Sequence, residues 1–135
     1  LAARGSEHAL VVHGGDRLYE ITKTDSTRIY EVRDGDVVGE TEFAPESVGL
    51  RRVNRAEIQG GTPEDNVRIM HELFAGTDTG PRADIIAINA AAGLLVAGIV
   101  KDMGAGLEAA KAVMTDGRAA AKVEAVVNLS KEIAD

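Results

Sequence analysis

The sequence is 135 residues long, with 44% hydrophobic and 27% charged residues, 3% aromatic residues and no cysteine. This is the size of one domain, and it is long enough to bury a hydrophobic core. The lack of cysteine excludes disulfides, thiolate metal sites and a cysteine nucleophile. The formal net charge is −7, without the basic stripe that attracts a phosphate backbone, so we do not expect a nucleic-acid partner.

The chain begins with LAARG instead of methionine, and no apolar run follows that would make a secretory signal. We interpret this start as that of a trimmed chain or a piece of a longer protein. The longest apolar stretch, residues 85–100, is interrupted by Asn89 and is rich in alanine and glycine. Because a membrane span needs about 20 strongly apolar residues, this stretch predicts a buried helix, and we expect no membrane partner.

The first strand signal is the apolar run 9–12, which is typical of a buried strand that ends in a loop at Gly14 and Gly15. His13 stands at the carboxyl end of this strand, where α/β folds bind their ligands. We therefore keep His13 as a candidate functional residue. His8 precedes the strand and is interpreted as structural.

Two β-prone segments, 27–33 and 36–43, flank the dipeptide Asp34-Gly35. This dipeptide predicts a hairpin, because a type I′ turn requires positive φ at both central residues. Residues 44–61 are predicted to form a loop with one short turn near its start.

Residues 62–134 follow a helical period. Thr62 supplies a capping hydroxyl and Pro63 stands at the first helical position, and both are typical of a helix start. Small residues dominate the second helix, among them Ala91 and Ala92, so we expect neighbouring elements to approach its backbone closely. The four helices are expected over about residues 62–76, 83–99, 106–115 and 118–133.

Two carboxylates, Asp16 and Glu20, lie on the loop after the first strand. Mg²⁺ prefers a small number of carboxylates together with substrate phosphates, which this loop can supply; a solvated acidic loop is the alternative. Gly60-Gly61 could hold an anion at a helix N-terminus, although the acids that follow favour a simple cap. His71 has no second ligand at a metal-binding spacing and is interpreted as a helix residue. No residue is assigned a catalytic role.

Longer strings in the sequence resemble the carboxy-terminal part of the anthranilate phosphoribosyltransferase family. Upstream, ALVVHGGDRLYEIT and the RDG of the hairpin match the same family in the same order. The resemblance extends from about Ala9 to Ser130. The downstream strings are GGTPEDNVRIMHELFAG (60–76), GPRADIIAINAAAGLLVAG (80–98) and GLEAAKAVMTDGRAAAKVEAVVNLS (106–130).

The resemblance implies an α/β fold of the phosphoribosyltransferase and nucleoside-phosphorylase type, with strands over 9–43 and helices over 62–134. It implies that residues 1–135 form the carboxy-terminal part of the α/β domain, without the family's amino-terminal helical domain and diphosphate loop. The complete enzymes transfer phosphoribose from phosphoribosyl pyrophosphate to anthranilate with Mg²⁺, in tryptophan biosynthesis, as cytoplasmic homodimers. We expect this segment alone to be inactive.

The resemblance also implies a metal site. The family loop usually has Gly-Leu-Asp-Glu, whose Asp and Glu bind magnesium, and the matching stretch here is Arg17-Leu18-Tyr19-Glu20. Glu20 matches the metal-binding Glu, whereas Tyr19 stands where the Asp is expected. Because a phenol is neutral at about pH 7 and is a poor Mg²⁺ ligand, Asp16 is kept as the substitute for the second ligand.

Two alternatives stay open. The departure at Tyr19 is compatible with a related phosphoribosyltransferase or nucleoside phosphorylase that uses another acceptor. The missing diphosphate loop is compatible with a noncatalytic interaction domain that associates with a separate catalytic chain.

Overall fold

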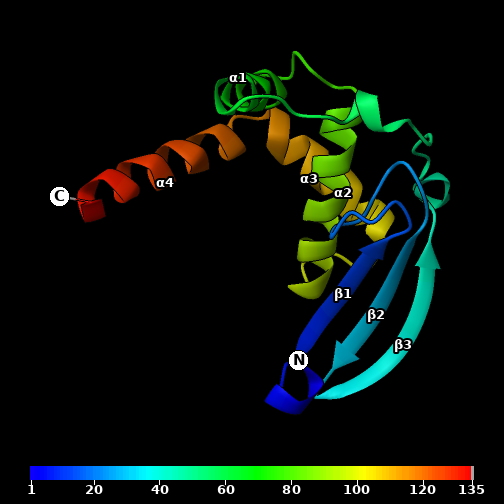
Figure 1. Cartoon of the computed structure of the whole chain (residues 1–135). Coiled ribbons are helices and arrows are strands. Elements are labelled where there is room, and N and C mark those ends of the chain that lie inside the picture. Colours follow the sequence, from blue (N-terminus) through cyan, green and yellow to red (C-terminus); the bar gives the residue numbers. More distant parts are fainter. Residues whose placement is uncertain (135) are drawn as a thin grey trace.

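The chain forms a small antiparallel sheet followed by helices (Figure 1), in a computed structural model that describes residues 1–134. The sheet consists of β1 (His8–Gly14), β2 (Thr27–Arg33) and β3 (Asp36–Phe43), in that order. The predicted hairpin between β2 and β3 is confirmed, since Asp34 and Gly35 have positive φ values of 50° and 84°. A register shift at Glu31 and Val32, which the sequence does not signal, bends the same hairpin.

The expected helices are confirmed, with shifted ends. They are α1 (Pro63–Phe74), α2 (Pro81–Val96), α3 (Met103–Thr115) and α4 (Arg118–Ala134). Helix α2 ends earlier than predicted because Gly98 takes a left-handed φ of 69°. Helix α3 begins earlier because Asp102 Oδ1 accepts the N–H of Ala105 at 2.8 Å and caps the helix. Short 3₁₀ turns occupy Ala2–Arg4, Pro45–Val48 and Arg55–Glu57, and only the second of these was predicted.

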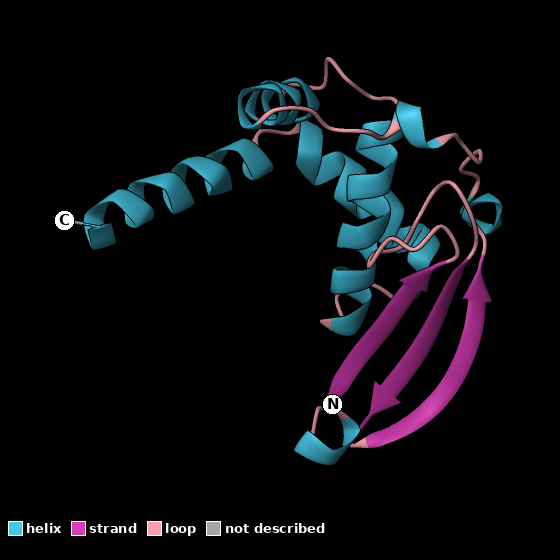
Figure 2. Ribbon diagram, in the orientation of Figure 1, coloured by secondary structure: helices cyan, strands magenta, loops and turns pink. Residues whose placement is uncertain are grey.

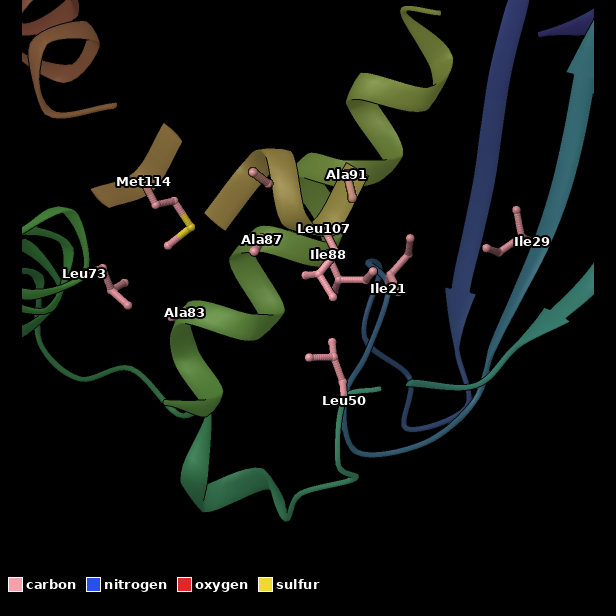
Figure 3. Close-up of a cluster of buried hydrophobic side chains, with 11 residues drawn as sticks. Ile21, Ile29, Leu50, Leu73, Ala83, Ala87, Ile88, Ala91, Leu107 and Met114 are labelled. Carbon is pink, nitrogen blue, oxygen red and sulfur yellow. The ribbon is translucent and has the colours of Figure 1, made fainter. Parts of the chain in front are cut away.

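The helices lie on one side of the sheet, and α4 extends away from the others (Figure 2). Helix α2 packs against both β1 and α3. The core lies between these elements, and the Asn89 side of α2 faces the loop that follows β1. Figure 3 shows the central cluster, which contains Ile21, Ile29, Leu50, Leu73, Ala83, Ala87, Ile88, Ala91, Leu107, Ala110 and Met114.

The predicted close approach to α2 is confirmed at one position. Ala91 is fully buried, and a Cβ added to Gly106 of α3 would lie 2.8 Å from the Ala91 Cβ. The neighbouring positions differ, because Ala92 is only half-buried and Gly93 is exposed with nothing within 4 Å of an added Cβ. The fold of residues 1–134 therefore uses only part of the small-residue surface of α2.

Helix α4 contributes no buried residue within the described chain. It exposes Val126, Leu129 and Ile133 to solvent. None of the helices in residues 1–134 has the length and apolar character needed to cross a membrane.

Candidate functional site

The loop of residues 15–26 follows the carboxyl end of β1 (Figure 1) and carries both carboxylates predicted as metal ligands. Glycines shape its start. A Cβ at Gly14 would lie 2.6 Å from Asp16 Oδ1, and a Cβ at Gly15 would lie 2.6 Å from Asp25 Oδ2. Side-chain atoms occupy the space on both glycines, so the loop folds back closely on the end of the strand.

Asp16 stabilises the loop through hydrogen bonds to other loop residues. Its Oδ1 accepts the backbone N–H of Leu18 at 3.1 Å, and its Oδ2 accepts the hydroxyls of Thr22, at 2.6 Å, and of Thr24. Partial burial of Asp16 opposes ionisation, but these hydrogen bonds together lower the pKa of the carboxyl below its ordinary value. Both oxygens of the Asp16 carboxylate therefore already accept hydrogen bonds from the loop.

Arg17 adopts a left-handed conformation with φ of 70°, which an L side chain rarely takes. Its N–H donates to the Gly14 carbonyl oxygen at 2.9 Å and closes a tight turn. The Arg17 side chain is exposed. The backbone at Arg17 is thus strained, and the strain is held by the hydrogen bonds on either side of it.

Tyr19 and Glu20 project from the outer part of the loop. Tyr19 is 92% exposed, and Glu20 is exposed and forms no hydrogen bond or ion pair with residues 1–134. Over the same residues, no group of three or more His, Asp and Glu side chains could hold a metal ion. The loop thus offers one free carboxylate, which fits a Mg²⁺ shared with a bound phosphate but not a cage made by protein alone.

Ile21 fixes the position of Glu20. The Ile21 side chain is fully buried, and its backbone N–H donates to Asn89 Oδ1 at 2.8 Å. Asn89 Nδ2 donates in return to the Ile21 carbonyl oxygen, also at 2.8 Å, and to the Ile85 carbonyl oxygen at 2.9 Å. One amide of α2 therefore satisfies both backbone groups next to Glu20.

A charge cluster around the buried Lys23 anchors the loop three residues after Glu20. Lys23 is 1% exposed, and its Nζ binds Asp84 Oδ2 near the start of α2. Lys111 of α3 binds the other oxygen, Asp84 Oδ1, at 2.8 Å. Burial opposes ionisation of Asp84, but hydrogen bonds from Lys111 and Lys23 lower the pKa of its carboxyl below the ordinary value.

A polar hollow of about 360 Å³ lies beside the loop. Arg52 binds one of its lining residues: Nη1 is 3.0 Å from Asp25 Oδ1, and Nε is 2.9 Å from Glu46 Oε1. His13 is exposed on the wall of this hollow, so it stays a candidate for ligand contact. The lining residues are His13, Gly15, Asp25, Ser26, Arg28 and Glu42.

The other two histidines lie elsewhere. His8 Nδ1 is 3.1 Å from the Val96 carbonyl oxygen, and His8 Nε2 is 3.0 Å from Glu31 Oε1. His8 therefore connects β1, β2 and the end of α2, as the structural interpretation predicted. His71 is exposed on α1.

The start of α1 is a cap. Thr62 and Asp65 form a reciprocal capping box, with the Asp65 N–H donating to Thr62 Oγ1 at 3.2 Å. The Gly61 N–H donates to Asn66 Oδ1 at 2.9 Å. Because side chains of the helix satisfy these groups, the simple cap is confirmed over the anion site.

Sequence reasoning missed the partners that hold the loop. Asn89 had a signal, since it is the one polar side chain in the apolar stretch 85–100. Lys23 and Asp84 had none, because each is unremarkable among its sequence neighbours and their contact depends on how α2 packs on the loop.

Comparison with known proteins identifies the family. Residues 1–120 match the glycosyl transferase family, a/b domain. The chain belongs to this family.

Among members of this glycosyl transferase family, the chain is similar to anthranilate phosphoribosyltransferases. It is 45% identical over 130 residues to that of Phenylobacterium zucineum, which covers 96% of this chain and 38% of the relative. It is 36% identical over 124 residues to that of Chloroflexus aggregans, which covers 92% of this chain and 36% of the relative. The chain therefore spans well under half the length of these relatives.

Solved structures confirm the expected α/β fold of this family. Anthranilate phosphoribosyltransferase from Thermus thermophilus matches with a TM-score of 0.80 at 33% identity, over 90% of this chain and 35% of that chain. The Saccharomyces cerevisiae enzyme in complex with 4-fluoroanthranilate matches with a TM-score of 0.78 at 20% identity, over 87% of this chain and 34% of that chain, and shows the fold alone.

Proposed function

We propose that this chain is part of an anthranilate phosphoribosyltransferase, which transfers phosphoribose from phosphoribosyl pyrophosphate to anthranilate in tryptophan biosynthesis. The 45% identity to the Phenylobacterium enzyme over 96% of the chain carries this proposal. A yeast structure of the same fold is described in complex with PRPP and Mg, which supports Mg²⁺ as the cofactor. We further propose that the longer protein is cytoplasmic and homodimeric.

In the reaction, the amine of anthranilate forms a C–N bond to the anomeric carbon while the C–O bond to pyrophosphate breaks. When bound, Mg²⁺ supplies positive charge that neutralises the pyrophosphate leaving group. The contribution of this chain is to position a ligand for that ion. Glu20 presents an unpartnered carboxylate, and the hydrogen bonds between Ile21 and Asn89 restrict where it can lie.

The role proposed for Asp16 differs from that of Glu20. The Asp16 oxygens already accept hydrogen bonds from Leu18, Thr22 and Thr24. Direct coordination of a metal would compete with those bonds. We therefore propose that Asp16 supports the site by shaping the loop and that Glu20 is the direct ligand.

The test uses the longer protein that contains this chain, assayed with phosphoribosyl pyrophosphate and anthranilate. Glu20→Gln removes the charge of the ligand but keeps its shape, so the Mg²⁺ concentration for half-maximal rate should rise about tenfold or more. Glu64→Gln, at an exposed glutamate of α1, is the matched control and should leave that concentration unchanged. Equal Mg²⁺ dependence in the wild type and Glu20→Gln would contradict the assignment.

A second candidate is a related transferase with a different acceptor, which the exposed phenol of Tyr19 favours. Tyr19→Asp restores the carboxylate of the family pattern. If anthranilate is the acceptor, Tyr19→Asp should lower the Mg²⁺ concentration needed for half-maximal rate and leave the choice of acceptor unchanged. Wild-type protein that is inactive with anthranilate but consumes phosphoribosyl pyrophosphate with another amine would favour the second candidate.

A further inference from the structure

Arg17 combines a strained backbone with a side chain that the fold does not use. Among residues 1–134, only Arg17 and Asp34 have a positive φ without being glycine. Asp34 lies in the two-residue turn of the hairpin, which requires a positive φ. No such turn type accounts for Arg17, and glycine would adopt the same φ of 70° without steric cost. Glycine would therefore make a more stable loop than the arginine that the chain has.

The Arg17 guanidinium has no partner in the described part of the chain. Its side chain is exposed and forms no hydrogen bond or ion pair there. The other cation of the loop, Lys23, is 1% exposed and bound to Asp84. Arg52, which reaches the end of the loop from outside, is bound to Asp25. Arg17 is thus the loop cation that is left to bind a ligand.

The acids of the loop are engaged in the same way, with one exception. Asp16 accepts hydrogen bonds from two hydroxyls of the loop, and Asp25 is bound to Arg52. Glu20 is the acid that remains exposed and unpartnered in the described structure. The loop therefore presents one guanidinium, at Arg17, and one carboxylate, at Glu20, and these two groups do not form an ion pair with each other.

Hydrogen bonds hold the backbone around Arg17. The Arg17 N–H donates to the Gly14 carbonyl oxygen at 2.9 Å, and the Gly14 N–H donates to the Leu18 carbonyl oxygen at 3.0 Å. The Leu18 side chain is half-buried, whereas Arg17 and Glu20 are exposed. Because Arg17 and Glu20 are three positions apart, their Cα atoms lie within about 11 Å of each other. Both side chains therefore extend from one short segment whose backbone is held in place.

A guanidinium beside a carboxylate fits a pyrophosphate group that carries a divalent ion. The planar guanidinium donates two parallel N–H bonds to phosphate oxygens. A single carboxylate suits Mg²⁺, which takes its other ligands from phosphate oxygens and water. Glu20 would repel a phosphate without the ion, and Arg17 would repel the ion without a phosphate. The two side chains together therefore favour the complex over either component.

We propose that Arg17 binds the pyrophosphate group of phosphoribosyl pyrophosphate and that its guanidinium shares the neutralisation of that group with the Mg²⁺ held by Glu20. The identity of this substrate rests on the proposed function. Arg17 acts by direct contact and by charge, and it transfers no proton. The strained backbone at Arg17 then has a physical reason, because glycine would relieve the strain but supplies no cation at this point of the loop.

The test measures binding of inorganic pyrophosphate to the longer protein that contains this chain, by isothermal titration calorimetry without anthranilate. Arg17→Gln removes the charge and keeps a polar side chain. With Mg²⁺ present, its affinity for pyrophosphate should fall about tenfold or more, as expected for the loss of hydrogen bonds between charged groups. Arg17→Lys keeps the charge without the planar fork, so its affinity should lie between those of the wild type and Arg17→Gln.

Removal of Mg²⁺ with a chelator separates direct contact from an indirect effect through Glu20. Arg17→Gln should still bind pyrophosphate about tenfold more weakly than the wild type, because the guanidinium contacts the phosphate itself. Glu20→Gln should weaken binding only while Mg²⁺ is present. A loss in Arg17→Gln that disappears with the ion would mean that Arg17 only positions Glu20, and it would overturn the proposal.

Thermal unfolding gives a readout that does not depend on catalysis or on Mg²⁺. Arg17→Gly removes the guanidinium and the strain together. It should bind pyrophosphate as weakly as Arg17→Gln and yet unfold at a higher temperature than the wild type. If Arg17 served the fold alone, loss of stability would accompany any loss of binding.

Arg4→Gln is the matched control. Arg4 is exposed and lies near the N-terminus, at the opposite end of β1 from the loop (Figure 1). Arg4→Gln should leave pyrophosphate binding unchanged with and without Mg²⁺. Equal losses in Arg4→Gln and Arg17→Gln would show a general effect of net charge and would overturn the assignment of Arg17.

The outcomes separate this proposal from the proposed function. Wild-type affinity in Arg17→Gln, or a wild-type protein that binds no pyrophosphate, would overturn the role of Arg17 whichever acceptor the enzyme uses. Pyrophosphate binding that depends on Arg17, in a protein that does not use anthranilate, would support the role of Arg17 and contradict the acceptor alone.

Discussion

Asn89 binds Ile21 through both backbone groups of that residue: its side-chain oxygen accepts the Ile21 N–H, and its side-chain nitrogen donates to the Ile21 carbonyl oxygen, each at 2.8 Å. Ile21 is the residue after Glu20, and its side chain is fully buried. A single amide of α2 thus couples the helix to the loop that carries Glu20. The bond pattern resembles a short piece of sheet made between a backbone and a side chain.

Asn89→Ala tests this coupling. It leaves the Ile21 N–H and carbonyl oxygen without their partner, so the free energy of unfolding should fall by about 1–3 kcal/mol. Denaturant titration provides the measurement. Asn128→Ala, at an exposed asparagine of α4, is the control and should change stability by less than about 0.5 kcal/mol. Similar losses in both variants would mean that the Asn89 bonds contribute nothing specific.

Gly106→Ala tests the contact between α2 and α3. The new Cβ would lie 2.8 Å from the Ala91 Cβ and 3.0 Å from the Ala91 backbone, which cannot move aside easily. We expect a loss of about 1–3 kcal/mol in the free energy of unfolding. Gly93→Ala, at a helical glycine with open space around it, should instead gain about 1 kcal/mol. A stabilising Gly106→Ala would show that the helices lie further apart.

Arg17→Gly tests the strain in the loop. Arg17 has a φ of 70°, and glycine takes this conformation without steric cost. Relief of the strain should outweigh the greater entropy of glycine in the unfolded chain, for a net gain of about 0.5–1 kcal/mol. Thermal unfolding measures the change. Arg33→Gly, in the extended backbone of β2, should be destabilising, and a loss at both positions would contradict the account of Arg17.

The parts of the fold that local chemistry decides were predictable from the sequence. The hairpin follows from the φ preferences of Asp34-Gly35, and the start of α1 follows from the hydroxyl and proline at Thr62 and Pro63. Helix ends were displaced where one residue decides them, as Gly98 does for α2. The hairpin and the helix start depend on interactions between neighbours in the chain, so the sequence pattern contains them.

The candidate site was only partly predictable, because the contacts that define it join distant segments. The sequence places both predicted ligands on one loop, but whether a carboxylate oxygen is free depends on the hydroxyls that bond to it. The hydroxyls of Thr22 and Thr24 donate hydrogen bonds to Asp16, whereas no side chain among residues 1–134 bonds to the Glu20 carboxylate. The bond between Lys23 and Asp84 joins the loop to α2, so no local spacing in the sequence predicts it.

Asp84→Asn tests the cluster of Lys23, Asp84 and Lys111 and the dependence of its contribution to stability on pH. Because Lys111 and Lys23 lower the pKa of Asp84 in the folded chain, the unfolded chain binds more protons once the pH approaches the ordinary carboxyl value. The stability that Asp84 contributes is therefore complete at neutral pH and is lost as the pH falls below about 4, through the lowered pKa. The contribution of Asp16 to stability is also lost as the pH falls below about 4, since its pKa is lowered as well.

At neutral pH, Asp84→Asn leaves the buried ammonium of Lys23 without a charged partner and should cost about 3 kcal/mol or more. The variant should also show a shallower loss of stability in acid than the wild type, measured by denaturant titration from neutral to acidic pH. Lys111→Met is the control, because the Lys111 side chain is 39% exposed and its removal should cost under about 1 kcal/mol. If Asp84→Asn is as stable as Lys111→Met and keeps the full acid dependence, the bond to Lys23 does not stabilise the loop.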